Sequence, residues 1–376
     1  MQYRPFGKDG WKVSALGFGA MRLPGNAAGN GVDVDLSVRL IRHGIDKGIN
    51  YVDTAYFYHD GQSEGIVAQA LRDGYRERVR IATKSPGHLI TTVDDFDRIL
   101  EEQLQRLETE CIDYYLFHGI GAKGLEQIRA LHLFDRIERA RADGKIGHIG
   151  FSFHDNNDAF KSIVDSYDGW EFCQIQFNYM DITNQAGLAG LQYAAARGIP
   201  VIVMEPLLGG RLTKPPKEAA DLFSATALSW TAAAWSLRWI WNHPEVATIL
   251  SGMNSFEQLD ENLATAEDAL PGSLTAEQCA TIDAARAALM KRTVIPCTGC
   301  RYCMPCPQGV EIPWNLEQYN AGGIYDDWGA PRFVYSVFMN ETQRASACIG
   351  CGECDSRCPQ KIPVSEWMPK IAKVLG

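Results

Sequence analysis

Length, composition and charge exclude several classes of protein. The chain has 376 residues, of which 46% are hydrophobic and 22% charged, the balance of a globular protein with a sizeable core. Its formal net charge of −10, with no basic run to offset it, disfavours nucleic-acid binding.

The N-terminal segment MQYRPFGKDGW lacks the apolar stretch that a signal peptide requires. The most apolar segment, residues 225–241, is short for a membrane span and contains Arg238, so we expect a buried helix there. We therefore expect a cytoplasmic protein that does not enter the membrane.

In chain order, residues 3–13 are expected to form a small hairpin around Lys8-Asp9-Gly10, and residues 25–31 a flexible loop. Short β-rich runs then alternate with amphipathic helical runs. The candidate strands are residues 15–18, 50–54, 79–83, 112–117, 148–152, 172–177, 201–204 and 246–250. Eight strands separated by helices within about 270 residues indicate a (β/α)₈ TIM barrel.

The helices between these strands have recognisable ends. In the helix expected at residues 92–109, Thr92 followed by Asp95 supplies a start like a capping box. Three other helices end in a glycine just before the next strand, at Gly48, Gly144 and Gly198, where a left-handed conformation is common.

An open doubly wound sheet is the alternative fold. It would place G-x-G-x-x-G directly after the first strand, but the chain has Gly17-Phe18-Gly19-Ala20-Met21-Arg22, with arginine in the last position. A barrel is therefore favoured.

Eight of the eleven cysteines form two tight runs near the C-terminal end. The first run is Cys297, Cys300, Cys303 and Cys306-Pro307, and the second is Cys348, Cys351, Cys354 and Cys358-Pro359. The second run matches the bacterial ferredoxin pattern, in which three cysteines surround one [4Fe–4S] cluster and the fourth reaches the other. On this pattern Cys306 joins Cys348, Cys351 and Cys354 on one cluster, and Cys358 joins Cys297, Cys300 and Cys303 on the other.

The first run departs from this pattern, because two residues rather than three precede its Cys-Pro, so the cross-ligation stays open. The long segment between the runs contains helix-like stretches at 314–319 and 331–339, which indicate a mainly helical 4Fe-4S dicluster domain. Two zinc sites are the alternative, but zinc motifs usually pair separated C-x₂-C knuckles. We place the barrel domain at residues 1–290 and the iron–sulfur domain at 291–376.

Four polar residues lie at or just beyond the ends of successive strands, where barrel enzymes keep catalytic groups. They are Asp53, Tyr58, Lys84 and His118. A carbonyl that accepts hydride needs a proton, which Tyr58 can donate if the Lys84 ammonium, held by Asp53, lowers its pKa. His118 can orient the carbonyl oxygen. Each residue alone could be a cap, an ion pair or a core residue, but together they favour catalysis.

At these residues the sequence resembles the aldo/keto reductase superfamily. The likeness rests on LGFGAMRLP, VDTAYFY, GQSE, ATK, the His118 site and IGFS, and runs from about residue 3 to residue 265. With CTGCRYCMPCPQG and CIGCGECDSRCPQ, the whole chain is similar to the branch that carries a fused iron–sulfur domain. The resemblance implies that Asp53, Tyr58, Lys84 and His118 form the catalytic tetrad.

The resemblance also implies contacts for a nicotinamide cofactor. Its carboxamide would meet Ser152 and Gln174, and its phosphates the loops at residues 206–210 and 251–255. The implied residues are Pro206, Leu207, Gly209, Ser251, Gly252 and Asn254, followed by Gln258 and Asn262. Met204 stands where an aromatic residue often stacks on the nicotinamide, and Phe153-His154 replaces the asparagine that commonly follows the serine. Gly252 and Gln258, at the usual basic clamp for an NADP 2′-phosphate, are uncharged, so NAD and NADP both stay open.

The sequence thus predicts an enzyme that reversibly reduces a small aldehyde or ketone with NAD(P)H and carries two [4Fe–4S] clusters. The alternatives are a reductase fed single electrons by a ferredoxin-like donor, and a non-enzymatic electron-transfer protein built on the same barrel. A structural role for the clusters stays open as well.

Overall fold

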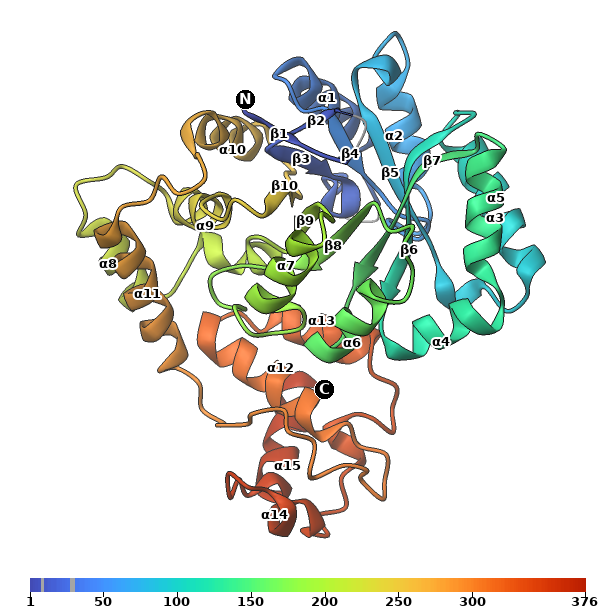
Figure 1. The fold of residues 1–376 in the computed structure, drawn as a ribbon. Helices are drawn as coiled ribbons and strands as arrows, with labels where there is room; N and C mark the ends of the chain where they lie inside the picture. The colour runs from blue at the N-terminus through green and yellow to red at the C-terminus, as the bar shows by residue number, and fades with distance from the viewer. Residues whose placement is uncertain (8–9, 28–30) are drawn as a thin grey trace. The chain divides into compact units, whose positions relative to one another are not determined.

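The structure is a computed structural model that describes residues 1–7, 10–27 and 31–376. The chain divides into two compact units (Figure 1). Unit 1 comprises Met1–Gly209 and Ala233–Ala276, and unit 2 comprises Gly210–Ala232 and Glu277–Gly376. The domain boundary expected near residue 290 stays a prediction.

Eight parallel strands of unit 1 close into a barrel (Figure 1). They are β3 (Leu16–Gly19), β4 (Tyr51–Asp53), β5 (Arg80–Ser85), β6 (Ile112–Ile120), β7 (Ile146–Phe153), β8 (Phe172–Gln176), β9 (Val201–Met204) and β10 (Val246–Ser251). Each strand pairs with the next along the chain, and β10 closes the barrel against β3. The predicted barrel is confirmed, and every predicted strand overlaps an observed one.

Helices follow the strands and cover the outside of the barrel (Figure 1). They are α1 (Val34–Asp46), α2 (Ser63–Leu71), α3 (Val93–Arg106), α4 (Ala122–Ala130), α5 (Leu133–Ala142), α6 (Asn157–Val164), α7 (Gly187–Ala196), α9 (Ala232–Trp241) and α10 (Phe256–Asp268), with short 3₁₀ turns η1 (Ala20–Arg22), η2 (Arg76–Arg78) and η3 (Gly87–Leu89). The capping box predicted at Thr92 and Asp95 starts α3. In the segment 225–241 only α9 is helical, and most of its side chains are buried.

The N-terminal hairpin closes one end of the barrel. Its strands, β1 (Tyr3–Pro5) and β2 (Lys12–Ser14), pair antiparallel, whereas the predicted turn residues 8–9 lie outside the described residues, as do residues 28–30 of the predicted loop. The buried Phe6 ring packs 5.1 Å from Tyr114 and 5.9 Å from Phe172, near the start of β6 and β8. The hairpin therefore fills the N-terminal end of the barrel and leaves the opposite end for chemistry.

Unit 2 is mainly helical. Its helices are α8 (Lys217–Ser224), α11 (Ala276–Met290), α12 (Ile312–Tyr325), α13 (Gly329–Val337), α14 (Glu353–Arg357) and α15 (Val364–Leu375), with 3₁₀ turns η4 (Leu208–Thr213) and η5 (Ala345–Ala347) at or near its segments. A small core that includes Leu316, Met339 and Ile371 holds α12, α13 and α15 together. The predicted helical stretch 314–319 lies within α12, and the stretch 331–339 overlaps α13, which ends at Val337. No helix in the described ranges is long and apolar enough to cross a membrane.

Candidate active site and cysteine-lined hollows

Four polar side chains come together at the C-terminal end of the barrel. Asp53 ends β4, Lys84 lies at the end of β5, and His118 lies near the end of β6. Tyr58 follows in the turn after β4. Because β4, β5 and β6 are neighbours in the barrel, their carboxyl ends bring the four residues predicted from the sequence into one place.

Lys84 is the centre of this group. Its Nζ donates to Asp53 Oδ1 at 2.6 Å and to the carbonyl oxygen of Thr54 at 2.7 Å. It also donates to the Tyr58 hydroxyl oxygen at 3.4 Å. The Lys84 and Asp53 side chains are 1% and 4% exposed. An unbroken line of polar contacts therefore joins the buried carboxylate to the tyrosine hydroxyl.

The electrostatics of the group keep Tyr58 protonated. Burial raises the pKa of Tyr58 above its usual value, and the Lys84 ammonium opposes this effect without overcoming it. The net shift is upward because the hydroxyl lies in a poorly solvated place, so the ammonium does not bring the Tyr58 pKa below its usual value. Burial lowers the pKa of Lys84, but the Asp53 carboxylate and Tyr58 outweigh it and raise that pKa. The ammonium is thus charged at neutral pH.

His118 presents a neutral ring beside Tyr58. Burial lowers its pKa well below the usual value, and the nearby Lys84, His154 and His88 charges lower it further. The Nδ1 atom is buried without a hydrogen-bond partner in the structure. The Phe57 ring stacks on His118 with centroids 4.8 Å apart and planes 4° from parallel. This stacking, which sequence reasoning missed, fixes the orientation of an imidazole that can donate or accept at neutral pH.

A buried polar network supports the strand that carries Lys84. The fully buried Glu64 carboxylate accepts hydrogen bonds from Thr83 Oγ1 and Gln103 Nε2, both at 2.7 Å. Gln103 Nε2 also lies 3.2 Å from the carbonyl oxygen of Lys84. Burial raises the pKa of Glu64. Sequence reasoning assigned no role to Glu64 or Gln103, because their partners lie on other elements.

Two polar residues on neighbouring strands fit a carboxamide. Ser152 on β7 and Gln174 on β8 are paired in register, and Ser152 Oγ accepts a hydrogen bond from the Gly119 backbone N–H at 2.7 Å. Gln174 Nε2 has only the Met204 sulfur, at 3.5 Å, while Gln174 Oε1 is buried without a partner. A buried acceptor without a donor is unfavourable, and the amide N–H₂ of a nicotinamide would satisfy it.

The loops after β9 and β10 hold the other residues implied for the cofactor. Asn254 N–H donates to Gln258 Oε1 at 3.1 Å, and Asn262 Nδ2 donates to Ser251 Oγ at 3.1 Å. Ser255 Oγ accepts from the Gln258 N–H at the start of α10. The loop after β9 contains Pro206, Leu207 and Gly209, and the loop after β10 begins at Gly252. The structure therefore brings these residues to the same end of the barrel as the tetrad.

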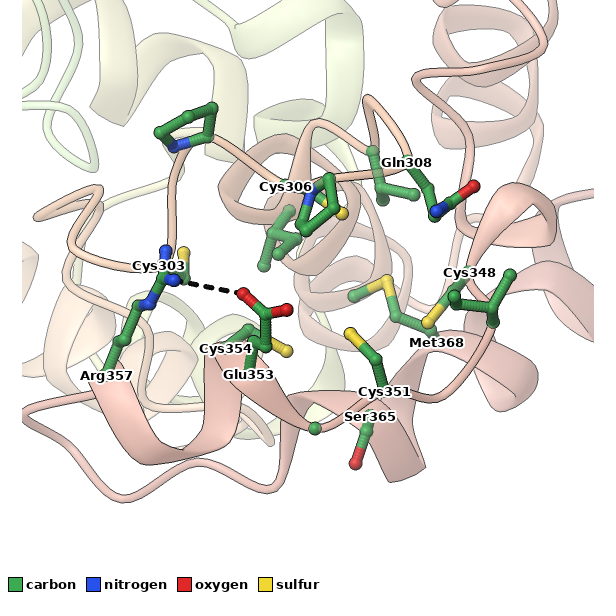
Figure 2. Close-up of a pocket in the computed structure, with 16 residues that line it drawn as sticks. Cys303, Cys306, Gln308, Cys348, Cys351, Glu353, Cys354, Arg357, Ser365 and Met368 are labelled. Atoms are coloured by element: carbon green, nitrogen blue, oxygen red, sulfur yellow. Dashed lines mark hydrogen bonds and ion pairs between the residues drawn. The ribbon is translucent and has the colours of Figure 1, made fainter.

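Five cysteines line a hollow of about 430 Å³ in unit 2, open to solvent. Figure 2 shows Cys306 on one segment and Cys348, Cys351 and Cys354 on another, around the same space. Cys303 also lines this hollow, and apolar groups such as Met368 complete the lining. The Gly350 N–H donates to Cys348 Sγ at 3.4 Å.

A second hollow of about 320 Å³ is lined by Cys297, Cys300 and Cys358, and also by Cys303, which borders both hollows. In both runs the second cysteine follows a left-handed glycine, Gly299 with φ 69° and Gly350 with φ 70°, which lets the backbone turn around the hollow. Among the described residues no three His, Cys, Asp or Glu side chains converge on a single metal ion. The cysteines around each hollow fit a cubane cluster. When the shared Cys303 is counted with the second hollow, they form the two sets of four that the ferredoxin pattern pairs.

Comparison with known proteins gives matches for both parts of the chain. The model of the aldo/keto reductase family matches residues 15–287, and that of the 4Fe-4S dicluster domain matches residues 296–362. L-galactose dehydrogenase of Arabidopsis thaliana is 27% identical over 283 residues, 70% of this chain and 88% of the relative. Aflatoxin B1 aldehyde reductase member 4 of Homo sapiens is 26% identical over 306 residues, 64% and 86% of the two chains. An aldo-keto reductase from Klebsiella pneumoniae in complex with NADPH has a TM-score of 0.60 and 25% identity, covering 75% of this chain and 95% of that one.

Proposed function

Since the chain belongs to the aldo/keto reductase family and carries a 4Fe-4S dicluster domain, we propose that it reversibly reduces a small aldehyde or ketone with NAD(P)H. The proposal is carried by the contacts that lead from Asp53 through the Lys84 ammonium to the Tyr58 hydroxyl. They place a protonated hydroxyl beside a fixed positive charge at the mouth of the barrel, which is what a developing alkoxide requires.

Each side chain of the tetrad has its own role in the reaction. A nicotinamide cofactor, when bound, would supply the hydride for the carbonyl carbon. Tyr58 donates its proton to the carbonyl oxygen, and the Lys84 ammonium stabilises the phenolate that remains. Asp53 keeps Lys84 charged and in place. His118, neutral at pH 7, binds the carbonyl oxygen through an N–H and orients it.

Two features support a nicotinamide dinucleotide as the cofactor. The unpartnered Gln174 Oε1 and the neighbouring Ser152 match the donors and acceptors of a carboxamide. The related structure from Klebsiella pneumoniae contains NADPH. Gly252 and Gln258 carry no charge for a 2′-phosphate, so the proposal covers NADH and NADPH alike.

The cysteine-lined hollows support two [4Fe–4S] clusters in a domain that we place at residues 291–376, after a barrel domain at residues 1–290. One set of ligands is Cys306, Cys348, Cys351 and Cys354, and the other is Cys297, Cys300, Cys303 and Cys358. Such clusters transfer single electrons when bound.

Replacing Tyr58 by phenylalanine tests the function. Tyr58→Phe should lower turnover by about 10²-fold or more, because the proton donor is gone, while fluorescence titration still detects NADPH binding. Tyr56→Phe is the matched control, since the Tyr56 hydroxyl bonds to Glu102 instead. Turnover is measured anaerobically with a panel of aldehydes and ketones. Near wild-type turnover in Tyr58→Phe contradicts the proposal.

A reductase fed with single electrons is the second candidate. Cys300 and Cys351 are exposed, so each cluster would have an edge that a ferredoxin-like donor could approach. The test is to reduce the clusters with dithionite and add carbonyl substrate without nicotinamide. Reoxidation of the clusters would favour this candidate, and no reoxidation would leave them a structural role.

A further inference from the structure

An ion pair spans the end of one barrel strand. Arg22 Nη2 lies 3.5 Å from Glu205 Oε1. Arg22 ends η1, just after β3, and Glu205 directly follows β9. Strand β10 lies between β3 and β9 and pairs with both. The pair therefore bridges the carboxyl end of β10, where Gly252 begins the next loop.

The arginine lies against both loops that follow the last two strands. A Cβ atom built on Gly252 would lie 2.9 Å from Arg22 Cβ, and one built on Gly209 would lie 3.0 Å from Arg22 Nη2. The stem of Arg22 therefore lies on Gly252 and its guanidinium reaches Gly209. In (β/α)₈ barrels the loops after the seventh and eighth strands frequently bind phosphate, and these are the loops after β9 and β10.

The glutamate is held in an unusual backbone conformation. Glu205 has φ 52°, in the left-handed region that residues other than glycine seldom adopt. Its carbonyl oxygen accepts hydrogen bonds from Asn178 Nδ2 and from the Leu208 N–H, both at 3.1 Å. These bonds fix the turn and direct the carboxylate to the mouth of the barrel, beside Arg22. Backbone strain of this kind is often kept at functional sites.

The exposure of the pair argues against a mainly structural role. The side chains of Arg22 and Glu205 are 47% and 28% exposed. Ion pairs with this much solvent contribute little to stability, so the guanidinium can change partners easily. A carboxylate beside a phosphate site would repel the ligand unless a cation lay between them, and Arg22 is in that position.

We propose that Arg22 binds the diphosphate of the dinucleotide cofactor and that Glu205 competes for the same guanidinium. This inference rests on the proposed function and adds a residue pair that sets cofactor affinity. Binding exchanges the Arg22–Glu205 contact for an Arg22–diphosphate contact, in which the planar guanidinium can hold two oxygens. Because NADH and NADPH share the diphosphate, Arg22 strengthens the binding of both equally. This agrees with the uncharged Gly252 and Gln258, which do not favour the 2′-phosphate of NADPH.

The two partners should therefore change affinity in opposite directions. The test is calorimetric titration of the full-length, anaerobically purified protein with NADH, NADPH and ADP-ribose. Arg22→Gln should raise Kd for all three by about 10-fold, and Arg22→Lys by less, because the charge remains. Glu205→Gln should lower Kd by roughly 3-fold, because it frees the guanidinium and removes a repelling charge. The thermal midpoint Tm of each variant shows whether it is folded.

Four outcomes of these titrations support or overturn the proposal. Opposite shifts, equal for NADH, NADPH and ADP-ribose, support the proposal. If Arg22→Gln and Glu205→Gln both weaken ligand binding, the ion pair mainly holds the two loops in place, and the proposal is overturned. Loss confined to NADPH would assign Arg22 to the 2′-phosphate and overturn the diphosphate contact. A wild-type protein that binds none of the three probes would contradict the cofactor in the proposed function, and this inference with it.

Discussion

The Lys84 ammonium lies 2.6 Å from Asp53 Oδ1 at the end of the barrel, where both side chains are almost fully buried. Removing one member of a buried ion pair leaves the other charge uncompensated, typically at a cost of about 3–5 kcal/mol. We therefore expect Lys84→Met to lower the free energy of unfolding by that amount and to abolish most turnover.

The double variant Asp53→Asn/Lys84→Met separates stability from catalysis. It removes both charges, so most of the lost stability should return while turnover stays low. Denaturant unfolding and turnover assays on the two variants and the wild type measure both effects. A double variant that recovers turnover together with stability would show that the pair serves only the fold.

The barrel and its tetrad could be read from local sequence. The strands are short β-rich runs between amphipathic helices, and Asp53 and Lys84 end two of them, so the barrel geometry alone brings their side chains together. The cysteine spacings predicted clusters in the same direct way, because a [4Fe–4S] site needs thiols at fixed short intervals.

The side-chain contacts around the tetrad could not be predicted from local sequence. Arg22 and Glu205 are far apart in the sequence, and neither belongs to a local pattern that indicates its partner. The stacking of Phe57 on His118 depends on how a turn folds back across two strands. The direction of the Tyr58 pKa shift could not be predicted for a related reason, because the burial that raises this pKa is a property of the tertiary structure.

The neutral His118 predicts a pH dependence of stability. Burial lowers its pKa well below 6.5 in the folded state, whereas in the unfolded chain it titrates near the usual value. As the pH falls below about 6.5, the unfolded chain therefore takes up a proton that the folded protein does not, and folding loses stability. This group alone contributes a slope of at most about 1.4 kcal/mol per pH unit.

His118→Gln isolates this contribution, since glutamine does not titrate and the other histidines are unchanged. The difference in Tm between the variant and the wild type, measured anaerobically from pH 7.5 to 5.5, should shift in favour of the variant as the pH falls. A difference that stays constant over this range would mean that His118 titrates normally in the folded protein.

The unpartnered Gln174 Oε1 predicts opposite effects on stability and on binding. Gln174→Leu removes a buried acceptor without a donor, so the cofactor-free protein should keep or raise its Tm. The same change removes the partner of the nicotinamide amide, so Kd for NADH should rise by about 10-fold. ADP-ribose lacks the nicotinamide and serves as the control, with an unchanged Kd. Equal weakening of NADH and ADP-ribose binding would mean that the substitution acts on a part of the site other than the nicotinamide contact.

The two hollows predict which cysteines share a cluster, and iron content can test it. Cys306 lines one hollow with Cys351, and Cys300 lines the other. If ligands are shared in this way, Cys306→Ala/Cys351→Ala disrupts one cluster and keeps about four iron atoms per chain, whereas Cys306→Ala/Cys300→Ala disrupts both and keeps almost none. Iron and sulfide analysis after anaerobic purification measures the difference, with each single variant as a control. The reverse result would assign Cys306 to the cluster of its own run, as the shorter spacing before Pro307 allows.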